Sequence, residues 1–126
     1  MAKKVLIYKE EVYDIVGCAM KVHSILGPGF HESVYQEALA YEFTRNDIPF
    51  EKEKLLEIKY DDIILNKKYI ADFICYDKII IETKALTEIC PDHFSQVINY
   101  LKATGLKLGL IVNFGEKSLK TKRIAY

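Results

Sequence analysis

Three stretches of the chain carry apolar side chains at the 3.6-residue spacing of an α-helix. The first covers residues 12–26 and is followed by the turn-forming Gly27-Pro28-Gly29. The second runs from residue 31 to about residue 46, where Ile48-Pro49 ends it. The third begins at Pro91 and ends near Gly105. The spacing therefore predicts three helices, the first of about four turns.

The other apolar positions fall in shorter runs that indicate β-strands. Residues 50–60 alternate charged and apolar side chains loosely, as in a strand that is exposed on one side. Residues 69–75 and 79–84 are apolar, β-branched runs, and the three residues between them predict a hairpin. Residues 108–114 predict a final buried strand, whereas the basic residues 118–126 fit either a short strand or a tail. The order ααβββαβ predicts an α/β fold with helices on both sides of the sheet, because both faces of the hairpin strands are apolar.

Length and composition narrow the class of protein. A chain of 126 residues, half of them apolar, fits a single domain over residues 1–126. The net charge of zero means that any phosphate-binding surface must be local. The three cysteines lack C-x-x-C spacing, so neither a disulfide framework nor a zinc site is expected. Because there is no bilayer-length apolar run, and the stretch after Met-Ala-Lys-Lys is too short for a signal peptide, we expect a cytoplasmic protein without a membrane contact.

The predicted hairpin brings two acidic residues together. A three-residue loop pairs Cys75 with Ile79, and this register places Asp72 opposite Glu82. Side chains that face each other across two strands are about 5 Å apart at Cβ, so two carboxylates repel unless a divalent cation lies between them. Lys84, two residues beyond Glu82, has its ammonium on the same face. The pattern predicts a Mg²⁺ or Mn²⁺ site, to which the backbone carbonyl of the residue after Glu82 can add a further oxygen.

Two alternatives remain open for this pair. A different loop length shifts the register by one residue and separates the acids across the two faces of the sheet. The acids Asp72 and Glu82 can also be paired with lysines at the end of a sheet, since a D…E-x-K triplet often occurs by chance.

The third helix carries polar residues on the side opposite its apolar stripe. Gln96 and Tyr100 are one turn apart there, and His93 joins them. Such side chains can donate hydrogen bonds to a phosphate or orient Lys84. Taken alone, these residues favour the alternative of a solvated helix face.

Glu32 shares the apolar face of the second helix, where a carboxylate needs a partner or a cation. It is a candidate to complete the metal shell. The competing interpretation is a favourable interaction with the N-terminus of the helix. Tyr35 and His23, which also lie on apolar helix faces, are expected in the core.

The order of these motifs resembles a known family. The segment Gly29-Phe-His-Glu32-Ser-Val-Tyr35, followed by Ala71-Asp72-Phe73, Glu82-Thr83-Lys84 and Gln96-x-x-x-Tyr100, is similar to the GxxExxY proteins of the PD-(D/E)XK nuclease superfamily. The resemblance implies a restriction-endonuclease-like fold with a four-stranded mixed sheet flanked by helices. It also implies Asp72 and Glu82 as metal ligands and Lys84 as the catalytic lysine.

Further residues take roles through the same resemblance. Gln96 and Tyr100 look like the Q-x-x-x-Y motif of RecB-type and phage exonuclease relatives, and Glu32 would fill the place of an early-helix metal ligand. Thr83 departs from the pattern, in which a bulky aliphatic residue stands between the Glu and the Lys. Because this position contributes only its carbonyl to the metal, the departure need not affect catalysis.

Two functions follow as expectations. The first is a metal-dependent nuclease that hydrolyses phosphodiester bonds of DNA or RNA. The second is a catalytically inactive nucleic-acid-binding or protein-interaction module on the same fold, because fold alone does not establish function. Since a domain of this size offers little surface for gripping a duplex, we expect a homodimer or a part of a larger complex.

Overall fold

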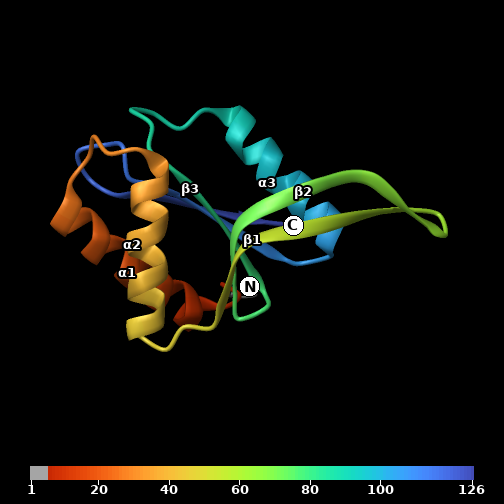
Figure 1. Cartoon of the computed structure of the whole chain (residues 1–126), viewed down its shortest axis with the longest axis horizontal. Coiled ribbons are helices and arrows are strands. Elements are labelled where there is room, and N and C mark those ends of the chain that lie inside the picture. Colours follow the sequence, from red (N-terminus) through yellow and green to blue (C-terminus); the bar gives the residue numbers. More distant parts are fainter. Residues whose placement is uncertain (1–5) are drawn as a thin grey trace, which may run out of the picture.

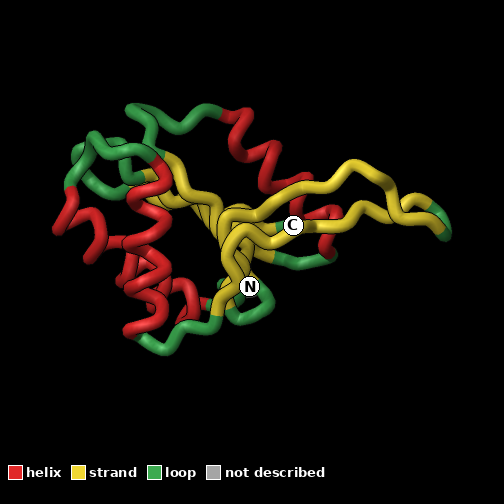
Figure 2. The backbone as a smooth tube through the Cα atoms, in the orientation of Figure 1, coloured by secondary structure: helices red, strands yellow, loops and turns green. Residues whose placement is uncertain are grey.

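A five-stranded sheet with helices on both faces forms the protein, which is described over residues 6–126 by a computed structural model (Figures 1 and 2). The elements follow one another as α1 (Lys9–Leu26), α2 (Glu32–Arg45), β1 (Phe50–Tyr60), β2 (Ile63–Cys75), β3 (Ile79–Lys84), α3 (Pro91–Thr104), β4 (Leu108–Asn113) and β5 (Lys120–Ala125). The strands lie in sequence order across the sheet, and β3–β4 is the parallel pair, connected by the α3 crossover. The α/β class is therefore confirmed. The Met-Ala-Lys-Lys segment used in the signal-peptide expectation lies outside the described residues.

The expected sheet of four strands is wrong, because the basic C-terminal segment forms a fifth strand. β5 pairs antiparallel with β4 from Leu108↔Ala125 to Asn113↔Lys120. It lies at the edge of the sheet, where charged side chains are common because they discourage pairing with another chain. Those same charges weaken the strand pattern in the sequence, which explains why the segment fitted a tail as well as a strand.

Strand β2 is longer than predicted, and it forms a hairpin with β1 that the sequence did not predict. β2 begins at Ile63 rather than at residue 69, so the distal part of the two strands projects beyond the body of the protein (Figure 1). Leu55 of β1 pairs with Ile70 of β2 in this hairpin, and both side chains are exposed to solvent. Helix α1 is also longer than the predicted four turns, since its 18 residues make about five.

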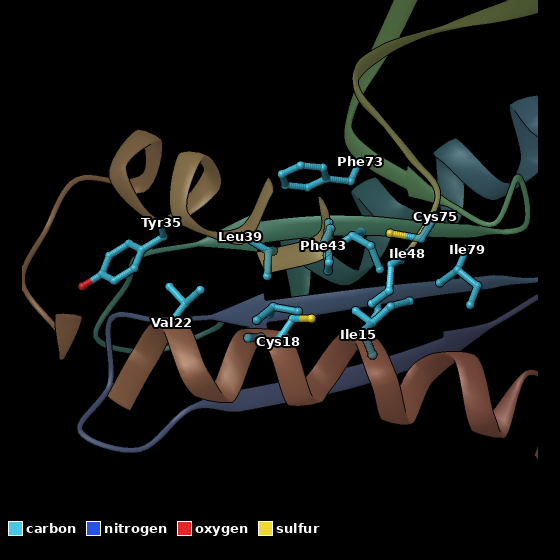
Figure 3. Close-up of a cluster of buried hydrophobic side chains, with 14 of the residues drawn as sticks. Ile15, Cys18, Val22, Tyr35, Leu39, Phe43, Ile48, Phe73, Cys75 and Ile79 are labelled. Carbon is cyan, nitrogen blue, oxygen red and sulfur yellow. The ribbon is translucent and has the colours of Figure 1, made fainter. Parts of the chain in front are cut away.

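One hydrophobic core lies between the sheet and helices α1 and α2 (Figure 3). Phe43 of α2 packs on the edge of Phe73 of β2, with ring centroids 5.4 Å apart. Tyr35 is fully buried and stacks on Phe114 with centroids 4.7 Å apart, which confirms its expected place in the core. His23 is half-buried, and its Nε2 lies 2.9 Å from the carbonyl oxygen of Glu116, as expected for a hydrogen-bonded histidine.

A second core lies on the opposite face of the sheet, under α3. Val97 and Leu101 of α3 pack there against Ile80 and Ile111 of the central strands. The helix approaches β4 closely at Gly109, where an added Cβ would collide with the side chain of Val97. Side chains of β3 thus alternate between the two cores, which confirms that helices cover both faces.

Each of the three helices packs one apolar side against the sheet. Within residues 6–126, none of them combines the length and the apolar composition needed to cross a bilayer.

Candidate functional site

The turn between β2 and β3 has the predicted three residues, Tyr76, Asp77 and Lys78. The strands pair as Cys75↔Ile79, Ile74↔Ile80 and Phe73↔Ile81, which confirms the predicted register. Asp72 and Glu82 are the next residues on the two strands. The acids therefore face each other at the point where the regular pairing ends.

The acidic pair replaces the backbone ladder with side-chain hydrogen bonds. The backbone N–H of Asp72 donates to Glu82 Oε1 at 3.0 Å, and the backbone N–H of Thr83 donates to Asp72 Oδ2 at 2.8 Å. Each carboxylate thus binds the backbone of the opposite strand. This reciprocal arrangement holds the two carboxylates beside each other.

The neighbouring strand β1 is also irregular here. Glu53, which lies between the residues paired with Phe73 and Ala71, has a left-handed φ of 54°. A non-glycine residue in this region is uncommon in a strand and indicates a local distortion. Both neighbours of β2 therefore depart from regular strand pairing around Asp72.

Burial and charge act together on Glu82. Only 4% of this residue is exposed, and the pKa of its carboxyl is raised to about 8, first by burial and then by the negative charge of Asp72. The hydrogen bond from the Asp72 backbone and the positive charge of Lys84 oppose the shift. The site therefore resists holding two negative charges unless a cation accompanies them.

Lys84 and Glu32 lie within electrostatic reach of the pair. Burial is the main cause that raises the pKa of Glu32, followed by the charge of Asp72, and Lys84 lowers it. Lys84 is half-buried, and none of the ion pairs within 4.0 Å among residues 6–126 involves it. Its ammonium is thus near the acids without being bound tightly to either of them.

A polar chain from helix α2 reaches the pair through Thr83. Gln36 Nε2 donates to Thr83 Oγ1 at 2.9 Å and to Glu32 Oε1 at 3.3 Å. Thr83 Oγ1 in turn donates to Asp72 Oδ2 at 2.9 Å. Gln36 was not among the predicted site residues, although an amide on an apolar helix face, one turn after Glu32, indicates a polar partner nearby.

The polar side of α3 is only partly as predicted. Tyr100 was placed away from the core, but it is 6% exposed and packs on Tyr69, with ring centroids 5.1 Å apart. Its pKa is raised to about 12, first by burial and then by the charges of Glu82 and Asp72, so its hydroxyl lies within electrostatic reach of the acids. Gln96 is exposed and interacts with Tyr100.

His93 lies in the first turn of α3, where it takes part in the cap of the helix. Its Nδ1 accepts a hydrogen bond from the backbone N–H of Cys90 at 3.2 Å, as part of the cap that begins α3. This bond fixes one ring nitrogen in a helix-capping role.

The donor atoms of the pair fit a hard divalent cation. The two carboxylates carry oxygen donors, the ligand type that Mg²⁺ and Mn²⁺ prefer. Burial and the charge of Asp72 raise the pKa of Glu82 even though the positive charge of Lys84 opposes them, so a cation between the two acids would be stabilising. Among residues 6–126, no group of three or more His, Cys, Asp or Glu side chains lies close enough to hold an ion, so Glu32 does not form a three-acid cluster with Asp72 and Glu82 in this arrangement.

The Thr83 hydroxyl offers a direct test of the polar chain. Replacing Thr83 with Val keeps the side-chain shape but removes the bond to Asp72 Oδ2, and we expect affinity for Mn²⁺ to fall about tenfold, as for other residues that orient metal ligands. Thr83→Ser retains the hydroxyl and should bind as the wild type does. Calorimetric titration of the three proteins would make this comparison, and equal affinities of the Val variant and the wild type would contradict it.

The sequence matches the model of one protein family. A sequence model described as the PD-(D/E)XK nuclease superfamily matches residues 9–124, and it does not separate the GxxExxY group within the superfamily. The structure titled "Crystal structure of SSO0001" is similar, with a TM-score of 0.58 and 21% identity over 94% of this chain. Only 59% of that chain is covered, and likeness at this identity shows the fold alone. A search of curated proteins found no match.

Proposed function

This chain belongs to the PD-(D/E)XK nuclease superfamily, and on that premise we propose that it is a metal-dependent nuclease that hydrolyses phosphodiester bonds of DNA or RNA. Nucleases of this superfamily generally use divalent metal ions. The observation that carries the proposal is the pair formed by the half-buried Asp72 and the buried Glu82, whose carboxylates are held side by side by reciprocal hydrogen bonds.

The proposed roles follow from the positions of the side chains. Asp72 and Glu82 would hold Mg²⁺ or Mn²⁺, together with the carbonyl of Thr83. When bound, the ion supplies Lewis acidity toward the phosphate and lowers the pKa of water. Lys84, half-buried near the acids, would orient the attacking water or stabilise the charge that develops on the phosphate.

Residues on two helices would complete the site. Tyr100 lies within electrostatic reach of the acids, and its raised pKa keeps its hydroxyl protonated, so it remains a hydrogen-bond donor at neutral pH. Gln96 would contact the substrate from the exposed side of α3. Glu32 would act on the same site from the start of α2 by its charge.

A metal titration combined with a cleavage assay tests the proposal. We expect Mn²⁺ and Mg²⁺ to bind to the metal-stripped protein and to start cleavage of fluorescently labelled single-stranded or duplex DNA and RNA, and we expect EDTA to stop it. Binding of the ion without cleavage of any substrate would support the inactive nucleic-acid-binding module instead. Absence of ion binding would contradict the metal site itself.

A further inference from the structure

The register of the sheet places lysines of β5 on the same face as Glu82 and Lys84. Two rows of paired residues cross β3, β4 and β5: Glu82, Ile111 and Lys122 in one, and Lys84, Asn113 and Lys120 in the next. Paired residues on neighbouring strands point to the same face of a sheet. Ile111 packs under α3, so Lys122 and Lys120 also lie on the α3 face.

Contacts on both faces of β5 agree with this assignment. Lys122 Nζ lies over the ring of Phe94 of α3, 5.9 Å from its centroid. Arg123, which lies between Lys122 and Ile124 in the sequence and points to the other face, instead donates to the carbonyl oxygen of Ile7 at 2.6 Å, beside α1. The side chains of β5 thus alternate, and its lysines share the face of Lys84.

The lysines form a local basic surface on a protein with no net charge. Lys120 and Lys122 are exposed, and neither belongs to the ion pairs within 4.0 Å among the described residues. Glu116, an acidic side chain near this row, accepts a hydrogen bond from the Asn113 amide at its Oε2, at 2.9 Å. Exposed ammonium groups that surrounding carboxylates do not bind are available to phosphates.

We propose that Lys120 and Lys122 of β5 bind the phosphate backbone of a nucleic-acid strand that extends across the sheet from the acidic pair. The inference rests on the proposed function for its choice of partner, and it adds a second contact region outside the metal site. Two strand spacings separate β3 from β5, about 10 Å, which is roughly the axial rise of three nucleotides along one strand. The lysines therefore contact phosphates a few nucleotides from the one that would be cleaved.

Oligonucleotide binding in EDTA tests this surface without cleavage. We compare the wild type with Lys120→Ala/Lys122→Ala, using fluorescence anisotropy of a labelled single-stranded oligonucleotide at several salt concentrations. We expect roughly a tenfold loss of affinity at low salt, and a salt dependence weaker by about 1.4 in log–log slope, because two phosphate contacts are lost. Lys120→Arg/Lys122→Arg keeps both charges and should restore wild-type binding, which would exclude a folding defect.

A matched control uses two other exposed lysines. Lys67→Ala/Lys68→Ala, on the projecting part of β2, removes the same charge and should change the affinity less than twofold. An equal loss in both double variants would overturn the inference, as would absence of wild-type binding at low salt. If binding depends on Lys120 and Lys122 but no metal supports cleavage, the inference stands and the proposed nuclease activity fails. If the wild type cleaves but the β5 variant binds normally, the inference fails and the activity stands.

Discussion

Replacing Asp72 with Asn is expected to lower the rate of phosphodiester cleavage by about a thousandfold, which corresponds to about 4 kcal/mol of transition-state stabilisation. The amide oxygen of Asn can still accept the bonds that the Thr83 N–H and hydroxyl now donate to Asp72 Oδ2. The neutral side chain cannot, however, balance the charge of a divalent cation. The variant therefore separates the chemistry of the carboxylate from its structural role. Single-turnover cleavage at saturating Mn²⁺ measures the effect.

The matched control for this variant is Asp77→Asn in the β2–β3 turn. Asp77 is exposed and has a left-handed φ of 55°, a conformation that Asn adopts readily. The Asp77→Asn variant should therefore cleave at the wild-type rate. If Asp72→Asn cleaves as fast as the wild type, the activity does not arise at the acidic pair.

The second large effect is expected in the stability of the metal-free protein. Because the folded protein raises the pKa of Glu82 from 4.5 to about 8, it holds this proton more tightly than the unfolded chain. The stabilisation is fully present below pH 4.5 and is lost as the pH rises toward about 8. The loss is on the order of a few kcal/mol, since one pKa unit corresponds to about 1.4 kcal/mol. Urea unfolding in EDTA at pH 5 and pH 8 measures it.

Glu82→Gln removes this titration and keeps the size of the side chain. The difference in unfolding free energy between the wild type and the variant should therefore change with pH, whereas Glu57→Gln on exposed β1 should follow the wild type. Parallel pH curves for the wild type and Glu82→Gln would contradict the raised pKa. Because an ion binds the ionised carboxylate, Mn²⁺ binding at pH 7 should also release a proton from the wild type.

The acidic pair was predictable because its geometry is local. A three-residue loop fixes the register of a hairpin, and the register alone places Asp72 across from Glu82. The two-residue alternation of the strand then places Lys84 on the side of Glu82. No distant contact was needed for these steps, so the sequence was sufficient.

The surroundings of the pair were harder to predict because they depend on packing between distant elements. A helical pattern separates the two sides of α3, but it does not reveal that the side carrying Tyr100 lies against Tyr69 of β2. The roles of Gln36 and Thr83 depend on how α2 sits on the sheet. The fifth strand forms only by pairing with β4, and its charged residues lack the apolar alternation by which a strand is recognised in a sequence.

The hydrogen bonds of the acidic pair also affect how an ion would bind. They engage one oxygen of each carboxylate, Glu82 Oε1 and Asp72 Oδ2, with the backbone of the opposite strand. Folding therefore fixes the direction of both carboxylates before an ion would arrive, and the second oxygen of each carboxylate is the one left to turn toward it. Such preorganisation lowers the entropy lost on binding, and it links the affinity for the ion to the integrity of the sheet.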